Sequence, residues 1–347
     1  MDPFTQGLLG AAAVQVSKVP RKSARLAALV GALGGMAADL DVLITSKTNP
    51  LLAFEYHRHF THSLVFVPAG GALVGLAIWA LLTKLLKREA ELKLCILWAT
   101  VGYATHAVLD ACTSYGTLLL WPLFPQRVAW DLIAVIDPIF TLALLVGVVA
   151  SLRTRRPTGA SLALLAAGLY LGANALQSSR VEKLIRGVAR ERDHAITRLA
   201  IHPTLFNNLV WRVLYLDQQD VIHAQAVHAG WFGDLALFEG GSAPRMDRRR
   251  DYPQIPNGSV LARDLDLFDH FSARFVGSAE ASPNHEYGDL RYSILPNGLA
   301  PLWGIRFDPS RPQAHAEVWF NRRYSNDDLK IFWNMLRGNP WADREAP

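Results

Sequence analysis

The sequence predicts a mainly α-helical fold, in which a polytopic membrane domain of five to six helices precedes a soluble α+β domain. Residues 1–178 are rich in Ala, Leu, Val and Gly, whereas residues 179–347 carry regular charges and turn residues. The first half also contains apolar stretches of about twenty residues, the length that a helix needs to cross a bilayer. We therefore predict two domains, 1–178 and 179–347, within the 347-residue chain.

Several apolar segments of the first half are candidate membrane helices. They cover residues 26–45, 63–82, 92–110, 133–151 and 160–178, with a short sixth segment at 4–17. The segment 63–82 is the strongest candidate because it contains no charged residue. Loops rich in Lys and Arg lie at 18–25, 84–93 and 153–156, and the positive-inside rule places them in the cytoplasm. With six membrane helices, both termini and the whole second domain are then extracytoplasmic.

The N-terminus and the cysteines argue against a cleavable signal peptide, a Cys-x-x-Cys zinc site and a disulfide. The first basic cluster follows the first apolar run, unlike the order in a cleavable signal peptide, so we expect this segment in the mature protein. No Cys-x-x-Cys pair occurs, which excludes a thiolate zinc site of that type. Cys95 and Cys112 would lie about 25 Å apart along a helix, too far for a disulfide.

The second half has the pattern of an α+β domain. Helices are predicted over 179–193, which is amphipathic, and over 326–336, which follows a helix-start signal. Strand-like runs occupy 221–227, 289–295, 302–307 and 316–320. Residues 244–253, PRMDRRRDYP, are predicted to form an exposed loop whose charges are solvated.

Five ionisable residues lie inside the apolar segments or at their ends. They are Asp39, Asp41, His106, Asp110 and Asp137. A central Asp in a membrane helix costs about 2.5–3.5 kcal/mol, so such groups need partners or a function. The topology places all five at the outer face, beside the loop that contains EYHRHFTHSL, residues 55–64. Because other residues set that topology, the agreement indicates one shared site.

The spacing of these residues is compatible with a metal site. His106 and Asp110 are four residues apart, so they lie on one helical face and can reach a common ion. Asp39 and Asp41 would point about 200° apart on a helix, so either the helix breaks there or only one of them is a ligand. Several imidazoles combined with carboxylates suit a divalent transition metal, zinc first, with manganese or iron as alternatives.

Simpler roles remain open for the same residues. Histidines in membrane loops commonly lie at the interface or form hydrogen bonds, and Asp137 before Pro138 can cap a helix. His106 and Asp110 can form a pair that joins two helices. Histidines of the second half lack ligand spacing and are predicted to be structural: His202, His223, His228, His285 and His315.

Five motifs of the first half resemble one known family. MDPFTQGLLGA, GGMAADLDVL, YHRHFTHSL, GYATHAVLDACTSYGT and VIDPIFT occur in the order expected of the YdjM-like family of membrane-bound, metal-dependent hydrolases. The resemblance is close over residues 1–145 and looser in the second half. We therefore expect an integral protein of the bacterial inner (plasma) membrane. The metal ligands that the resemblance implies are Asp39, Asp41, His57, His62, His106 and Asp110.

Two positions depart from the pattern of that family. His59 stands where the family often has glycine, so the resemblance favours His57 as a ligand, although helical spacing would pair His59 with His62. Thr5 and Gln6 stand where the family commonly has Thr-His. If that histidine is a ligand elsewhere, this chain has lost it, and the case for a second metal ion weakens.

These observations favour a membrane-embedded hydrolase acting at the outer face on a phosphoester of a lipid or lipid-linked molecule. A metal would activate water there. Arg58 is predicted to clamp a phosphate, and Asp41 or Asp137 to act as general base. We expect membrane lipid and a lipid-like substrate as partners, and no nucleic acid. A metal-stabilised scaffold or regulator and an ion-coupled transporter are alternatives, whereas the lack of His-Glu-x-x-His argues against a metallopeptidase.

Overall fold

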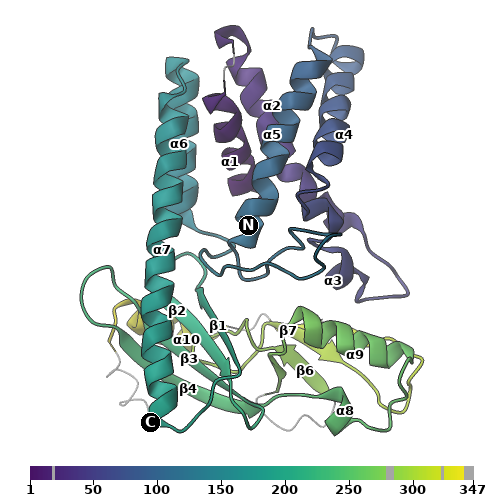
Figure 1. Cartoon of the computed structure of the whole chain (residues 1–347), viewed down its shortest axis with the longest axis vertical. Coiled ribbons are helices and arrows are strands. Elements are labelled where there is room, and N and C mark those ends of the chain that lie inside the picture. Colours follow the sequence, from purple (N-terminus) through teal and green to yellow (C-terminus); the bar gives the residue numbers. More distant parts are fainter. Residues whose placement is uncertain (18–19, 279–284, 322–323, 340–347) are drawn as a thin grey trace. The chain divides into compact units, whose positions relative to one another are not determined.

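The structure is a computed structural model of the chain and describes residues 1–17, 20–278, 285–321 and 324–339. The chain divides into two compact units, and Figure 1 labels their elements. Unit 1 comprises Met1–Leu43, Tyr56–Ala175 and Leu205–Asn207. Unit 2 comprises Ile44–Glu55, Leu176–Thr204 and Asn208–Pro347.

Unit 1 is helical. Its main elements are α1 (Pro3–Val16), α2 (Ala24–Met36), α4 (Val67–Ala80), α5 (Leu92–Ala111), α6 (Pro138–Thr154) and the first part of α7 (Thr158–Glu191). Within the described ranges, the helical stretches long and apolar enough to cross a membrane are Ala24–Leu43, Val67–Leu85, Leu92–Ala111 and Thr158–Glu191. Helix α6 is apolar but has 17 residues, and α1 has 14. The predicted helical membrane domain is therefore confirmed, with four full-length candidate spans among these residues.

Short helical pieces lie between these helices. A turn η1 (Arg21–Ser23) precedes α2, and a π-helical turn η4 (Leu81–Leu85) extends α4. The segment that begins as α2 continues as a 3₁₀-helix, η2 (Ala37–Leu43). A short α3 (Leu52–Tyr56) and a single turn η3 (Phe60–His62) then lead to α4. The 3₁₀ geometry has three residues per turn, so it changes the directions in which the side chains of η2 point.

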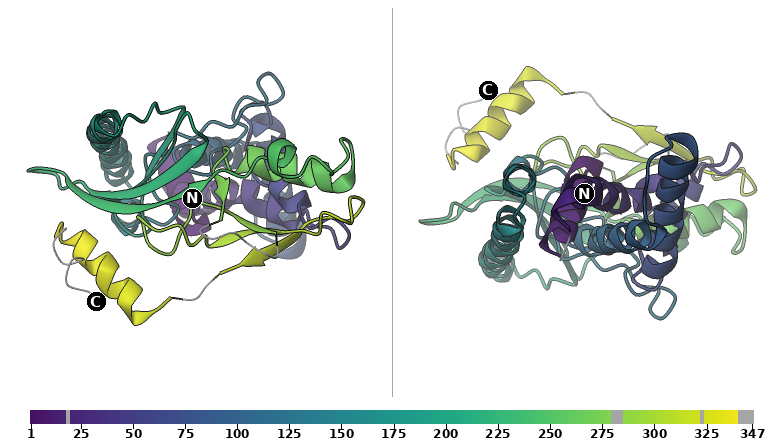
Figure 2. Two further views of the ribbon diagram at one scale, coloured as in Figure 1. Left: turned by 90° about the horizontal axis from the view of Figure 1, so that it is seen from below. Right: turned by 90° about the horizontal axis from the view of Figure 1, so that it is seen from above.

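Glycine backbones allow α1, α2 and α5 to pack at very short range. A Cβ atom built on Gly102 of α5 would lie 2.0 Å from the carbonyl oxygen of Gly31 on α2. One built on Gly10 of α1 would lie 2.4 Å from the same oxygen. Only glycine fits at these contacts, because any side chain would push the helices apart. Helix α1 also contacts α6, so it lies inside the bundle seen from above in Figure 2.

Unit 2 contains two antiparallel four-stranded sheets. The first has the strand order β1 (Arg198–Pro203), β2 (Val210–Leu216), β3 (Val221–His228) and β4 (Ala236–Pro244). The second has the order β5 (Val276–Gly277), β6 (Glu286–Asp289), β7 (Trp303–Arg306) and β8 (Glu317–Phe320). The helices of this unit are α8 (Arg248–Asp251), α9 (Val260–Phe271), α10 (Asn326–Leu336) and the second part of α7.

The second part of α7 covers the first sheet. Val181 and Ile185 are fully buried against Trp211 and Tyr215 of β2. Strands β2 and β3 form a hairpin whose turn is held by Asp217, because its Oδ1 accepts the backbone N–H of residues 219 and 221. Burial of this apolar face explains why α7 continues past its apolar first part as an amphipathic helix.

Several predicted elements of the second half are confirmed. The runs 221–227, 302–307 and 316–320 correspond to β3, β7 and β8, and 326–336 is α10. The run predicted as 179–193 is not a separate helix, because it continues α7 without a break.

Two predictions for the second half were wrong. The run 289–295 is not a strand beyond Asp289, because the backbone turns around the guanidinium of Arg212. That guanidinium donates hydrogen bonds to the carbonyl groups of residues 290, 291, 295, 296 and 298. The segment 244–253 is not a solvated loop, because Arg245 and Arg248 are buried and form ion pairs with Asp220 and Asp266.

Candidate metal centre

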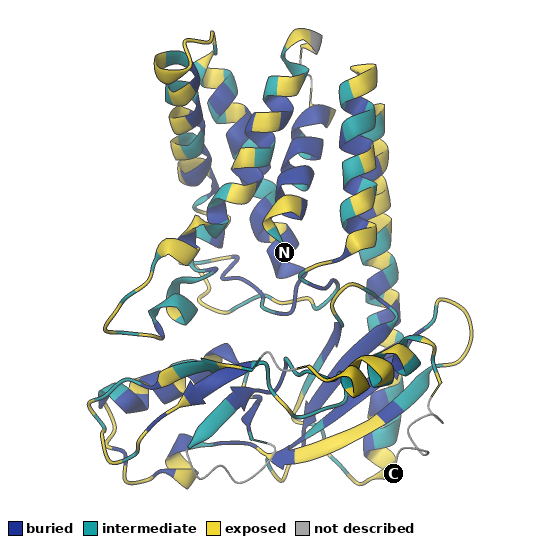
Figure 3. Ribbon diagram, turned by 180° about the vertical axis from the view of Figure 1, so that it is seen from behind, coloured by how far each residue is buried: buried dark blue, intermediate teal, exposed yellow. Residues whose placement is uncertain are grey.

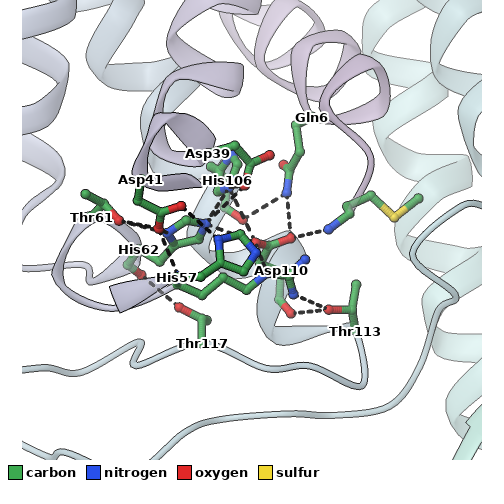
Figure 4. A network of polar contacts seen from close by, with 12 residues as sticks. Gln6, Asp39, Asp41, His57, Thr61, His62, His106, Asp110, Thr113 and Thr117 are labelled. Atoms are coloured by element: carbon green, nitrogen blue, oxygen red, sulfur yellow. Dashed lines mark hydrogen bonds and ion pairs between the residues drawn. The ribbon is translucent and has the colours of Figure 1, made fainter. Parts of the chain in front are cut away.

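Four side chains from three segments of unit 1 converge on one point (Figure 4). They are Asp39 of η2, His62 of η3, and His106 and Asp110 of α5. One donor atom of each residue lies within 4.8 Å of the donor atoms of the other three. All four belong to the set of six ligands that the sequence predicts, and they can hold a metal ion. We call these four residues the tetrad.

The distances within the tetrad match those of a tetrahedral metal site. His62 Nε2 lies 2.9 Å from His106 Nε2, 3.4 Å from Asp39 Oδ1 and 3.2 Å from Asp110 Oδ2. His106 Nε2 lies 3.4 Å from each of the same two carboxylate oxygens. Four ligands held at about 2.0–2.1 Å from one tetrahedral ion are separated by about 3.3 Å from each other. Five of the six distances between the donor atoms are therefore close to the edge length of one coordination tetrahedron, and the sixth, between the two carboxylate oxygens, is at most 4.8 Å.

The far sides of the two imidazole rings determine where their lone pairs point. Nδ1 of His106 lies 2.6 Å from the carbonyl oxygen of Gly35, which can only accept, so this nitrogen carries hydrogen. Nδ1 of His62 likewise faces the carboxylate of Asp41 at 3.2 Å. In neutral rings, both Nε2 lone pairs then point toward each other and toward two carboxylate oxygens. Such a group of acceptors requires a cation at its centre, either a metal ion or a ring proton.

Asp41 lies next to the tetrad and orients His62. Its Oδ2 accepts hydrogen bonds from the backbone N–H of Arg58 at 2.8 Å and from the hydroxyl of Thr61 at 2.9 Å, in addition to facing the imidazole of His62. Its Oδ1 lies 2.8 Å from Nδ1 of His57. A carboxylate behind a ligating histidine fixes the ring and increases its basicity as a ligand. Asp41 and His57 thus stand behind the donor atoms that face the centre.

The two aspartates of η2 therefore have different surroundings. The sequence left open whether the helix breaks or only one aspartate is a ligand, and the structure shows that the α-helix does end before the two aspartates. The α-helix gives way to 3₁₀ geometry at residue 37, and Asp39 alone joins the tetrad while Asp41 supports it.

Asp110 is the most enclosed carboxylate of the site. The amide of Gln6 donates to its Oδ1 at 2.9 Å, and the amino group of Met1 contacts the same oxygen. Nε of Arg58 lies 3.2 Å from Oδ2, and the guanidinium of Arg58 also donates to the hydroxyl of Thr113 at 2.8 Å. Arg58, which the sequence predicts to clamp a substrate phosphate, is buried and faces a carboxylate of the protein itself.

Two other predicted positions lie apart from the tetrad. Asp137 is the N-cap of α6, accepting the backbone N–H of Phe140 at 3.0 Å, and its Oδ2 accepts the hydroxyl of Tyr170 at 2.7 Å. Its contacts are those of the helix cap that the sequence left open as an alternative. The ring of His59 packs near that of Trp121, with 5.2 Å between centroids, and it is not part of the tetrad.

Sequence reasoning did not assign a role to several supporting residues. Gln6 stands out in the sequence only as a departure from the family pattern, yet its amide donates to Asp110. The hydroxyl of Tyr103 donates to the carbonyl of Thr61 at 2.7 Å, and Thr113 binds Arg58. Their signal was present, because Tyr103 and Thr113 lie within the run GYATHAVLDACTSYGT. Polar residues one turn before and after a ligand are natural candidates for such supports.

The electrostatics of the tetrad favour a bound cation. The side chains of His62, His106 and Asp110 are fully buried, whereas that of Asp39 is 15% exposed. Burial lowers the pKa of His62, but hydrogen bonds to the surrounding aspartates outweigh burial and raise it to about 10. Because Asp39 is the one partly exposed member of the tetrad, an ion or a small molecule can reach the tetrad from the side of Asp39.

A second His/Asp group lies in unit 2. It consists of His194, Asp217 and His223, whose donor atoms also lie within 4.8 Å of one another. Here the polar atoms are paired locally: His223 Nε2 lies 2.8 Å from Asp217 Oδ2, and His194 Nδ1 lies 2.9 Å from the hydroxyl of Tyr215. These bonds brace the β2–β3 hairpin, but the group also has donor spacing that could hold a metal ion, which the sequence did not predict for His223.

A comparison with known protein families finds a match for the first half of the chain. Residues 1–181 match the family described as YdjM inner membrane protein. The chain belongs to this family. The match covers the whole tetrad and its supporting residues, so the YdjM region is the part that contains the candidate metal centre. No curated protein and no solved structure matched the chain.

Membership of the YdjM inner membrane protein family agrees with the helices. Together with the four long apolar stretches among the described residues, it identifies an integral protein of the inner membrane.

Proposed function

We propose that this YdjM family member is a metal-dependent hydrolase that acts at the outer membrane face on a phosphoester of a lipid or lipid-linked molecule. The observation that carries the proposal is the convergence of two imidazole Nε2 atoms and two carboxylate oxygens at tetrahedral spacing. Asp39, His62, His106 and Asp110 would hold the ion. A bound zinc, manganese or iron would supply a water of lowered pKa and polarise the phosphoryl oxygen.

The surrounding residues would have distinct roles in this reaction. Asp41 already accepts from several donors, so we assign it to orienting His62 and not to proton transfer. Arg58 balances the charge of Asp110 from within the protein. Asp39 is the exposed member of the tetrad, so while its Oδ1 would hold the ion, its other carboxylate oxygen would be the one to accept a proton from an incoming water.

Exposed apolar side chains beside the tetrad support a lipid-like substrate. Leu40, Val42 and Leu43 alternate with the two aspartates of η2 and are 53–74% exposed. Leu64 and Val65 directly follow His62 and its neighbour, and are 40% and 55% exposed. The exposed edge of the tetrad is therefore surrounded by apolar side chains that can pack against acyl or isoprenoid chains. Contact of these side chains with water is unfavourable, whereas contact with such chains is favourable.

A metal-stabilised scaffold or regulator without enzyme activity is the second candidate. It is favoured by the fact that four protein donors converge on one point, since structural zinc sites have four protein ligands and catalytic ones keep a position open. The two candidates predict the same metal content and differ only in whether a substrate reacts.

Metal content of the detergent-purified full chain tests the centre itself. We expect a stoichiometric transition metal in the wild type, none in His62→Ala or Asp110→Ala, and full retention in the matched control His59→Ala. A wild type without transition metal would rule out the proposal, and metal retained in both variants would show that other residues are the ligands.

Release of phosphate from lipid phosphates in mixed micelles then separates enzyme from scaffold. We expect metal-dependent release by the wild type and by His59→Ala, and none by Asp110→Ala. Full metal loading without turnover of any lipid phosphate would favour the scaffold.

A further inference from the structure

Unit 2 carries an exposed aromatic pair between β3 and β4. Trp231 and Phe232 lie in the segment 229–233, AGWFG, here called the aromatic loop. Phe232 is 97% exposed and Trp231 is 43% exposed. Burying an apolar side chain of this size is favourable, so leaving it in water is unfavourable. Single exposed apolar residues are common, however, and it is the position of this loop that indicates a partner.

The aromatic loop is tied to one turn of α7. The side-chain amide of Gln177 donates to the carbonyl oxygens of Ala229 at 2.7 Å and Gly230 at 3.1 Å. The guanidinium of Arg180 donates to the carbonyl oxygens of Gly230 at 3.0 Å and Gly233 at 2.8 Å. These bonds hold the loop backbone, so its aromatic side chains stay at the level of residues 177–180 of the helix.

That turn is the place where the apolar part of α7 ends. The helix belongs to the candidate membrane spans, and Figure 3 colours much of its length as exposed or intermediate. Leucines on one face of it are 59–70% exposed: Leu162, Leu165, Leu169 and Leu176. Leu176 directly precedes Gln177. At 1.5 Å of rise per residue, the residues that hold the loop lie within about 6 Å of the last exposed leucine along the axis.

We propose that the aromatic loop is an interfacial anchor, in which Trp231 and Phe232 insert among the lipid headgroups next to α7. Aromatic residues, Trp above all, concentrate at the level where hydrocarbon gives way to water. The polar residues Gln177 and Arg180 mark that level on the helix, and the loop presents its apolar side chains there. The anchor would fix the depth of the end of β3 in the bilayer, and it does not depend on the metal centre.

The strand itself provides a matched control position. β3 has eight residues, Val221–His228, and an extended strand rises about 3.3 Å per residue. Gln219, in the turn at the other end of β3, therefore lies about 25 Å or more from the aromatic loop. Gln219 is exposed, like Phe232, so a probe at either position is accessible to solvent unless a partner covers it.

The test uses the full chain in lipid nanodiscs with an environment-sensitive fluorophore on Phe232→Cys or on Gln219→Cys. Cys95 and Cys112 are buried, and the unsubstituted chain serves as the labelling blank. We expect the fluorescence emission of the probe at 232 to be blue-shifted, to be quenched by nitroxide lipids and not to be quenched by an aqueous quencher. The probe at 219 should show the opposite quenching.

Two outcomes would overturn the anchor. Equal quenching of both probes by the aqueous reagent would place the aromatic loop in water. Protection of the probe at 232 from both quenchers would indicate a protein partner, such as a second copy of the chain. The double variant Trp231→Ser/Phe232→Ser gives an independent readout, because it should lower the melting temperature in nanodiscs more than in detergent.

Discussion

Replacing Asp41 distinguishes a metal ligand from a residue that orients one. Of the hydrogen-bond donors around its carboxylate, three reach Oδ2 and one, Nδ1 of His57, reaches Oδ1. In Asp41→Asn, the amide oxygen can keep the three bonds at Oδ2, and His57 can accept from the new amide by changing its tautomer. The substitution therefore removes the negative charge behind His62 while it leaves most of the hydrogen bonds in place.

The expected magnitude follows from this geometry. Losing a carboxylate that supports a ligating histidine lowers metal affinity by about 10–100-fold. We expect Asp41→Asn at the lower limit, about 1.4 kcal/mol, because only charge is lost. Asp41→Ala should reach the upper limit, about 2.7 kcal/mol, because it also leaves the buried donors of Arg58, Thr61 and His62 without their acceptor.

Competition between the purified chain and a chromophoric chelator measures these affinities at neutral pH. Asp137→Asn is the matched control, since it removes another buried carboxylate of unit 1, the one that caps α6. The metal affinity of this variant should equal that of the wild type. If Asp41→Asn abolished metal binding as completely as Asp110→Asn, Asp41 would be a ligand. Unchanged affinity in Asp41→Ala would show that it does not support His62.

Three further predictions concern packing, pH and topology. Gly102→Ala should lower the melting temperature and the metal content together, because its Cβ would meet the Gly31 carbonyl one turn before His106. Gly168→Ala, which faces open space on α7, should lower neither, since alanine is the better helix former. Burial and two neighbouring arginines lower the pKa of His202 to about 3, so stability is present above the unfolded pKa of about 6.5 and is lost as pH falls toward 3, by up to about 1.4 kcal/mol per pH unit. The melting temperature, followed by tryptophan fluorescence, should therefore decrease less steeply with falling pH in His202→Gln than in the wild type. Parallel plots of melting temperature against pH for the two proteins would contradict this. A reporter that is active only outside the cytoplasm should be active when it is fused after residue 347. A reporter that is active only in the cytoplasm should be active when it is inserted within residues 84–93. The reverse result would invert the proposed topology.

Sequence patterns predicted the membrane helices and a shared polar site at one end of them, whereas the family resemblance named the four residues of the tetrad among its six ligands. Apolar length identifies a span, and ionisable residues at one end of several spans indicate a shared site. The same rules could not separate Asp39 from Asp41, because that distinction depends on the 3₁₀ turn of η2. Nor could they show that Arg58 faces Asp110, since its orientation depends on how the loop folds back onto α5.

The errors in the second half have a similar origin. The run 289–295 has the composition of a strand, but the guanidinium of Arg212 collects its carbonyl groups and holds it as a series of turns. Arg245 and Arg248 read as solvated charges, but aspartates distant in sequence pair with them. In both places, a buried arginine has partners that are distant in the chain, which for Arg245 add to its neighbour Asp247, and a local pattern gives no sign of the distant ones.

Helix packing and ligand geometry are coupled in this site. Helices α2 and α5 meet through Gly31 and Gly102, and one turn further along the same interface the carbonyl of Gly35 accepts from Nδ1 of His106. The short distance between the helices is what allows that bond, and the bond turns Nε2 of His106 toward the other donors. A residue larger than glycine at this interface would thus act on the metal centre without touching it. The glycines of α2 and α5 are therefore as much a part of the site as the residues that face its centre.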